Sequence, residues 1–126
     1  MKTLISSEYA PTTVGPYSPG LSVGEWIFLS GQGGFDPTTG KMISDDIAEQ
    51  TAQTFRNIEV LLEAAGASLD NVVSCLVHPT DLSQFEAFNA IYEKKFAGIQ
   101  PVRTTVRADL CRRHARRDHC GRSSAS

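Results

Sequence analysis

The chain has 126 residues, 40% of them hydrophobic, which is the size and composition of one globular domain with a single core. Its formal net charge of −2 is uneven, because residues 1–110 hold 7 Lys and Arg against 13 Asp and Glu, whereas residues 111–126 hold 5 Arg against one Asp. An acidic body argues against electrostatic capture of nucleic acid by the folded domain and leaves only the tail to attract phosphates.

The sequence has no apolar run long enough for a membrane span, and its first residues lack the apolar stretch and cleavage site of a signal peptide. Three cysteines, Cys75, Cys111 and Cys120, form no disulfide framework, and we expect Cys75 to be a small buried strand residue. We therefore expect a cytoplasmic protein in a reducing compartment, without a membrane partner.

The first half of the chain predicts a hairpin and a long helix. Apolar runs on both sides of Gly24-Glu25 indicate a β-hairpin over residues 22–30. The glycine-rich segment 31–40 has no lysine and no G-x-G-x-x-G spacing, so we expect no nucleotide-phosphate site there. Helix-initiating residues from Ser44 precede apolar residues at three- and four-residue spacing, and a glycine follows at position 66. This pattern predicts an amphipathic helix of about six turns.

The second half predicts a strand, a helix and a further strand. Residues 71–77 are apolar and β-branched, and the strand is expected to end at His78-Pro79 because proline cannot donate to a ladder. Ser83 and Glu86 have the spacing of a capping box, and the aromatic residues that follow at helical spacing are assigned to the core.

The last predicted strand exposes an arginine. Side chains alternate along a strand, so Val102 and Thr104 lie on one face while Arg103 and Thr105 lie on the other. A rigidly held arginine can present its planar fork to a carboxylate through two parallel hydrogen bonds. Arg103 is therefore a candidate anion clamp, and an ordinary exposed arginine on a half-solvated strand is the alternative.

The order of elements predicts the fold class. An antiparallel hairpin followed by two helix–strand units indicates an α+β fold with both helices on one face of the sheet. Two helices cannot also cover the opposite face, so we expect another copy of the chain to cover it in a homo-oligomer.

Five ordered sequence blocks lie within residues 1–110. They are Gly15-Pro16-Tyr17-Ser18, Leu29-Ser30-Gly31-Gln32, Ala64-Ala65-Gly66, Phe88-Asn89-Ala90-Ile91-Tyr92-Glu93 and Pro101-Val102-Arg103-Thr104-Thr105-Val106. Together they resemble the Rid family, also called YjgF. The resemblance implies a chorismate-mutase-like mixed β-sheet with two helices packed on one face, and a homotrimer with three sites between subunits. It also implies hydrolysis of enamines and imines, such as 2-aminoacrylate, 2-iminopropanoate and 2-iminobutanoate, to 2-keto acids and ammonia, without a metal or an organic cofactor.

The resemblance assigns the residues closest to the chemistry. Arg103 matches the arginine that binds the substrate carboxylate, in agreement with its place on the predicted strand. Tyr17 matches the aromatic wall of the site. Thr105 matches a position, often cysteine in relatives, whose backbone groups face the reacting atoms. We expect water rather than a side chain to attack the imine carbon once the carboxylate is held and the nitrogen is protonated.

Three further positions match substrate-binding residues. Ser30 and Gly31 correspond to the loop edge of the site, and Asn89 corresponds to a polar residue near the cleft. Without the resemblance, Ser30 would be a strand end, Asn89 a helix-surface amide and Tyr17 a turn residue.

Residues 111–126 depart from the family, whose last strand carries a glutamate that orients the attacking water. The tail is rich in arginine and has no strand alternation. Back-translation of residues 111–122 with GC-rich codons, read from the second nucleotide, gives Ala-Ala-Gly-Thr-Leu-Val-Glu-Ile-Thr-Ala-Val-Ala, a Rid-like strand with its glutamate. We therefore divide the chain into a Rid-like domain over residues 1–110 and an atypical tail over residues 111–126. We hypothesise that the tail is an out-of-frame translation, which sequencing of the encoding DNA tests.

Three functions remain open at this point. The first is an imine deaminase, and the second is a catalytically impaired or non-catalytic small-ligand-binding protein. The third is an RNA-directed translation inhibitor or endoribonuclease, for which residues 1–110 offer neither a histidine pair nor a basic face. Thiol and imidazole groups in the tail lack the paired spacing of a zinc site, so we expect no functional metal there; they are Cys111, His114, His119 and Cys120.

Overall fold

The computed structural model describes residues 1–79 and 82–105. The strands are β1 (Lys2–Ile5), β2 (Gly20–Val23), β3 (Trp26–Leu29), β4 (Ser74–Val77) and β5 (Val102–Thr105), and the helices are α1 (Ile47–Ala64) and α2 (Phe85–Lys95). Short 3-10 turns, η1 (Leu69–Asn71) and η2 (Leu82–Gln84), precede β4 and α2. The predicted strand residues beyond position 105, the domain boundary at residue 110 and the four metal-binding groups of the tail lie outside the described residues.

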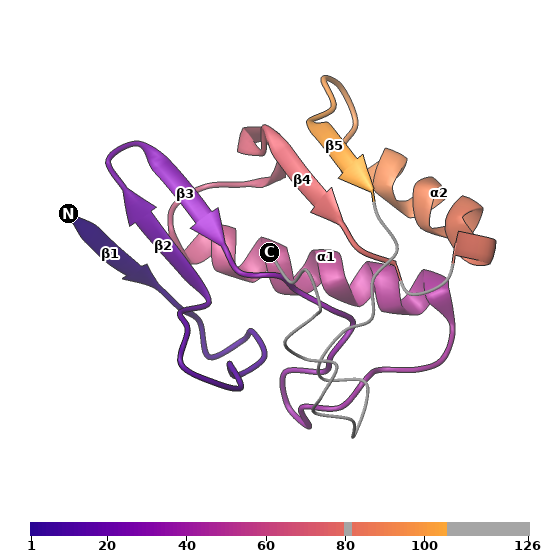
Figure 1. Ribbon diagram of the computed structural model, residues 1–126, viewed down its shortest axis with the longest axis horizontal. Coiled ribbons are helices and arrows are strands. Elements are labelled where there is room, and N and C mark those ends of the chain that lie inside the picture. The colour runs from indigo at the N-terminus through magenta and orange to yellow at the C-terminus, as the bar shows by residue number, and fades with distance from the viewer. Residues whose placement is uncertain (80–81, 106–126) are drawn as a thin grey trace.

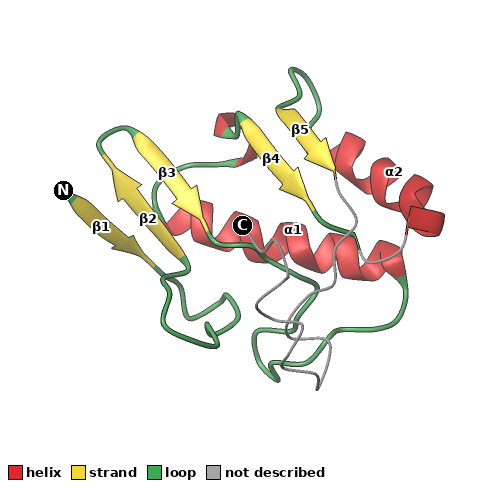
Figure 2. Ribbon diagram, viewed as in Figure 1, coloured by secondary structure: helices red, strands yellow, loops and turns green. Residues whose placement is uncertain are grey.

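The strands form two sheets that lie on one side of the helices (Figures 1 and 2). β1, β2 and β3 make an antiparallel sheet in that order, and β4 pairs with β5 in parallel. The predicted α+β class, with both helices on one face, is confirmed. Within the described ranges, none of the helices is both long enough and apolar enough to cross a bilayer.

Each sheet packs on the helices through one face. In the first sheet, Ile5, Ile27 and Leu29 pack with Leu61 of α1. In the second sheet, Cys75 and Val77 of β4 pack on a cluster from both helices that contains three buried aromatic residues, Phe55, Tyr92 and Phe96. The aromatic residues predicted for the core of α2 are therefore in part confirmed as core.

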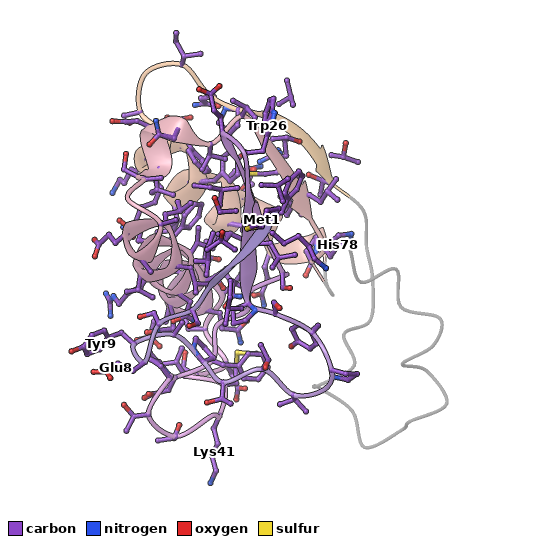
Figure 3. The ribbon with its side chains drawn as sticks, turned by 90° about the vertical axis from the view of Figure 1, so that its left-hand side faces the viewer. Met1, Glu8, Tyr9, Trp26, Lys41 and His78 are labelled. Carbon is purple, nitrogen blue, oxygen red and sulfur yellow. The ribbon has the colours of Figure 1, made fainter. Side chains whose placement is uncertain are left out.

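The opposite face of both sheets is apolar and exposed. Leu4, Trp26, Phe28, Leu76 and Val102 are each between 55% and 70% exposed. In Figure 3 the helices lie on one side of the strands, and Trp26 lies on the other side, near the tip of the hairpin. This is the face that we expect a second copy of the chain to cover.

Local sequence explains the hairpin and the ends of α1. Gly24 has φ 59°, a left-handed conformation that glycine adopts without a Cβ penalty, and it makes the turn between β2 and β3. Asp46 is the N-cap of α1, and its carboxylate accepts a hydrogen bond of 2.9 Å from the Glu49 N–H. At the other end, the Gly66 and Ala67 N–H groups close back on α1 carbonyls in a Schellman motif, with Gly66 at φ 78°.

Three sequence-based boundaries were wrong. The strand predicted from residue 71 begins at Ser74, because Asn71 belongs to the preceding 3-10 turn. The N-cap of α2 is Gln84 rather than Ser83, because the chain enters this helix through a 3-10 turn. Helix α1 has 18 residues, which make five turns rather than about six. The predicted end of the strand before His78 is confirmed.

Candidate functional site

Arg103 of β5 is surrounded by side chains of β4 and α2. Its partner across the parallel ladder is Cys75, so both side chains lie on the face of the sheet that packs on α2. Arg103 remains exposed. The strand therefore supplies a fixed backbone position from which a long cationic side chain reaches along α2 toward solvent.

One face of α2 holds the Arg103 guanidinium. The Arg103 Nη1 donates a hydrogen bond of 2.9 Å to the Asn89 Oδ1. The guanidinium carbon lies 4.7 Å from the ring centroid of Tyr92, 5.3 Å from that of Phe85 and 6.0 Å from that of Phe88. These distances are within the range of cation–π attraction. Asn89 and the three rings thus fix the direction of the guanidinium.

The charge of Arg103 is not neutralised by an acidic side chain of the described residues. The salt bridge among these residues joins the Lys95 Nζ to the Glu59 Oε1 at 3.2 Å and does not involve Arg103. A guanidinium has five N–H donors, and Asn89 uses one of them. Arg103 therefore keeps both its charge and most of its hydrogen-bonding capacity for an anion.

Behind Arg103 lie Cys75 and the buried Tyr92. Cys75 is half-buried, so the expectation of a buried cysteine was wrong. The Tyr92 side chain is 5% exposed, and its hydroxyl has no nitrogen or oxygen partner among the described residues. Burial, together with the adjacent Cys75 thiol, raises the pKa of Tyr92 to about 12. Burial also raises the pKa of Cys75, although the Tyr92 hydroxyl and the nearby Arg103 charge act in the opposite direction. The thiol stays protonated near neutral pH and is therefore a poor nucleophile.

A second group of predicted site residues lies near the ends of β2 and β3. The Ser30 hydroxyl donates a hydrogen bond of 2.6 Å to the Ser18 carbonyl, and the Ser30 N–H donates one of 2.9 Å to the Pro19 carbonyl. These bonds hold the segment that contains Tyr17 against the end of β3. Tyr17 is 47% exposed, and Gly31 is exposed beside Ser30.

A buried amide holds the loop that follows Gly31. Asn57 of α1 is fully buried, and its Nδ2 donates hydrogen bonds of 3.0 Å to the carbonyls of Gly33 and Phe35. The Asn57 Oδ1 accepts a bond of 2.9 Å from the Gln53 Nε2, which is also buried. The loop edge is therefore anchored to the helix layer by side-chain hydrogen bonds.

The structure brings the predicted site residues together in two groups. Arg103 and Asn89 are in direct contact, and Thr105 lies two residues further along β5 on the same face, half-buried. Tyr17, Ser30 and Gly31 form the other group. Within residues 1–79 and 82–105, no hydrogen bond or ring contact links the two groups. The two groups are therefore separate within one copy of the chain.

Sequence reasoning missed four residues around Arg103. Phe85, Phe88 and Tyr92 were assigned to the core alone, and Cys75 to a strand interior. A signal was present, because positions 85, 88, 89 and 92 share one helical face and so place the rings beside Asn89. Cys75 could not be found in this way, because its place depends on the parallel pairing of β4 with β5.

The described residues contain no group of three or more His, Cys, Asp or Glu side chains that could hold a metal ion. The site that they do contain is a cationic and aromatic one. It can bind a small planar anion through the arginine and pack an apolar group against the rings.

Comparisons with known proteins place the chain in a family. The profile of the family described as Endoribonuclease L-PSP matches residues 7–116. A RutC family protein of Saccharolobus solfataricus is 43% identical over 106 residues, which cover 84% of each chain. The 2-iminobutanoate/2-iminopropanoate deaminase of Mus musculus is 34% identical over 116 residues, which cover 92% of this chain and 86% of that protein.

A solved structure agrees with these sequence matches. The crystal structure of E. coli TdcF with bound serine has a TM-score of 0.79 and 30% sequence identity, and the match covers 83% of this chain and 84% of that one. The family match spans most of the chain, and the relatives share both its sequence and its fold. The chain therefore belongs to the Endoribonuclease L-PSP family, the same Rid family that its five sequence blocks resemble.

Proposed function

We propose that this chain is a reactive-intermediate deaminase that hydrolyses small 2-imino acids to 2-keto acids and ammonia. The observation that carries the proposal is the uncompensated guanidinium of Arg103, which Asn89 and three aromatic rings hold in one direction. The deaminase of Mus musculus supports the reaction class, because its name states 2-iminobutanoate and 2-iminopropanoate as substrates.

Arg103 binds the substrate carboxylate in this proposal. Two parallel N–H donors of a guanidinium match the two oxygens of a carboxylate, which fixes the plane of a 2-imino acid as well as its position. Asn89 takes one of the five donors, so donors remain for both oxygens of the ligand's carboxylate. The serine bound in the structure of E. coli TdcF also carries an α-carboxylate, which supports an amino-acid-like ligand for this fold.

Hydrolysis then needs few groups from the protein. Water adds to the carbon of the protonated imine, and the resulting carbinolamine loses its C–N bond as ammonia leaves and the 2-keto acid forms. In the net reaction, the protonated 2-imino acid and one water become the 2-keto acid and ammonium, and the carboxylate is unchanged. Holding the carboxylate aligns the electrophilic carbon with water and lowers the entropy cost of the attack. In the proposal, backbone groups at Thr105 face the reacting atoms.

We further propose that a complete site needs two subunits of a homotrimer. Arg103, Asn89 and Thr105 would come from one subunit, and Tyr17 with the Ser30–Gly31 loop edge from its neighbour. This arrangement explains why the two groups have no contact within one chain. The exposed apolar face of the two sheets, which includes Trp26 and Phe28, is the surface that trimerisation would bury.

A non-catalytic ligand-binding role would leave Arg103 able to bind 2-keto acids without turnover of imines, and the assay below separates that role from catalysis. An RNA-directed role has less support, because residues 1–110 have a net charge of −6 and contain a single histidine, His78.

The proposal is tested by generating 2-iminopropanoate in solution with an amino acid oxidase and following its loss with the full chain. Arg103→Ala is expected to lower kcat/KM about 100-fold, equivalent to roughly 3 kcal/mol for a charge-assisted contact. Arg103→Lys keeps the positive charge but loses the planar pair of N–H donors, so it is expected to have a rate between those of the parent chain and Arg103→Ala.

Arg56→Ala is the matched control, since Arg56 is an exposed arginine on α1. It is expected to keep the rate of the parent chain. Pyruvate binding that depends on Arg103, without any imine hydrolysis, would replace the proposal with the ligand-binding role. Equal imine hydrolysis by the parent and Arg103→Ala chains would contradict the carboxylate clamp.

A further inference from the structure

The Ser30 hydroxyl is bonded within its own chain. Ser30 directly follows β3, and its Oγ donates a hydrogen bond of 2.6 Å to the Ser18 carbonyl. A serine hydroxyl carries a single proton, so Ser30 cannot donate to a substrate carboxylate while this bond is made. The hydroxyl therefore holds the segment that precedes β2 rather than an acidic ligand.

The hydroxyl bond replaces a ladder bond that proline removes. Gly20 of β2 lies opposite Leu29 of β3, so the next pair along the two strands is Pro19 with Ser30. The Ser30 N–H donates a bond of 2.9 Å to the Pro19 carbonyl, but Pro19 has no N–H with which to return one. The Ser30 hydroxyl supplies a second bond one residue earlier, at Ser18. Ser30 therefore makes two bonds to this segment, one from its backbone and one from its side chain.

Tyr17 is the residue that this segment carries to the proposed site. It directly precedes Ser18 and is 47% exposed. Its N–H donates a bond of 3.0 Å to the Gly15 carbonyl, and a Cβ atom at Gly15 would lie 3.7 Å from the Tyr17 Cε2. Gly15 has φ 122°, a conformation that residues with a Cβ rarely adopt. The ring thus packs on a short turn of its own loop.

That turn has few other supports. Among residues 1–79 and 82–105, Tyr17 makes no side-chain hydrogen bond and no contact with another ring. Pro16 has no N–H, so it adds no backbone donor to the turn. Removal of the Ser30 hydroxyl would leave one hydrogen bond, between Pro19 and Ser30, to hold the turn at β3. The position of the Tyr17 ring therefore depends on the Ser30 side chain.

We propose that Ser30 is a positioning residue that acts on the substrate through Tyr17. Its hydroxyl fixes the turn at residues 15–18, and the turn presents the Tyr17 ring as a wall of the site. Ser30 itself makes no contact with the substrate carboxylate, which Arg103 binds. This inference rests on the proposed deaminase function for its effect on catalysis, but the placement of the ring can be measured without catalysis.

A double-mutant cycle tests the route from Ser30 to the substrate. Ser30→Ala is expected to lower kcat/KM for 2-iminopropanoate about fivefold in the full chain, which is the size of effect expected from one hydrogen bond. In a Tyr17→Ala chain the same change is expected to lower it less than about twofold, because no ring remains to be placed. Ser30→Thr keeps the hydroxyl and is expected to restore the parent rate. Ser22→Ala is the matched control, since Ser22 lies on β2 of the same sheet, and is expected to keep the parent rate.

Nuclear magnetic resonance measures the placement of the ring directly. Because the Tyr17 ring packs on Gly15, its ring current shifts the Gly15 Hα signals. Tyr17→Ala gives the reference position of these signals without the ring. Ser30→Ala is expected to move the Gly15 signals toward that reference, whereas Ser30→Thr is expected to leave them at the parent position.

An equal loss of rate from Ser30→Ala with and without the Tyr17 ring would overturn the proposal, because Ser30 would then act on the substrate directly. Gly15 signals that do not change in Ser30→Ala would also overturn it. If the parent chain hydrolyses no imine, the proposed function fails, and the Gly15 signals alone then support or overturn the placement of Tyr17 by Ser30.

Discussion

Replacing Asn57 is expected to destabilise the fold strongly, because this one buried side chain makes three hydrogen bonds to buried or partly buried groups. Asn57→Ala removes the hydrogen bonds of 2.9 to 3.0 Å that this side chain makes with the Gly33 and Phe35 carbonyls and with the Gln53 amide. A buried polar group that loses its partner costs about 1 to 3 kcal/mol. Three groups at the lower end of that range give a loss of roughly 3 kcal/mol, before any cost of the cavity left by the amide.

Equilibrium urea unfolding followed by circular dichroism measures this free energy. Asn57→Asp is expected to lose at least as much as Asn57→Ala, because a carboxylate would place an acceptor against the two carbonyls. Asn71→Ala is the matched control, since Asn71 is exposed and makes one side-chain bond, of 3.0 Å, with the Ser68 N–H. The control is expected to lose about 1 kcal/mol or less. An Asn57→Ala chain as stable as the control would refute the reasoning.

Three further predictions concern the scaffold. Because the pKa of Tyr92 rises from 10.0 to about 12 on folding, the free energy of unfolding should not change below pH 10 and should fall as the pH rises toward 12. Tyr92→Phe should remove this fall in stability at alkaline pH, as measured by denaturation at a series of pH values. A Cβ at Gly34 would lie 2.8 Å from the Gln50 Cα, so Gly34→Ala should cost about 1 to 3 kcal/mol, whereas Gly31→Ala, with no atom within 4 Å, should change thermal stability little. Asp46→Ala removes the cap of α1 and should cost about 1 kcal/mol in urea unfolding, and no loss would count against the capping bond.

The hairpin turn and helix α1 could be predicted from local sequence signals. Gly24 predicted the hairpin turn, and the residues from Ser44 to Gly66 predicted α1, because turns and caps depend on a few adjacent residues. The resemblance brought Arg103 and Asn89 into one site, and the structure places them in contact.

Long-range contacts were the part that could not be predicted. Cys75 lies opposite Arg103 only because β4 and β5 pair in parallel with that register. Asn57 interrupts an apolar helix pattern, and nothing adjacent to it shows that its amide holds a loop more than twenty residues earlier. Ser83 has the spacing of a capping box, but the chain enters α2 through a 3-10 turn that moves the cap to Gln84.

The central claim is that Arg103 binds the substrate through its carboxylate. The most direct measurement compares the catalysed hydrolysis of 2-iminopropanoate with that of a neutral imine of similar size, in the parent chain and in Arg103→Ala. The account predicts that the parent prefers the carboxylate substrate and that Arg103→Ala loses this preference by lowering the rate on 2-iminopropanoate alone. An equal loss on both imines, or a preference that survives the substitution, would contradict the account.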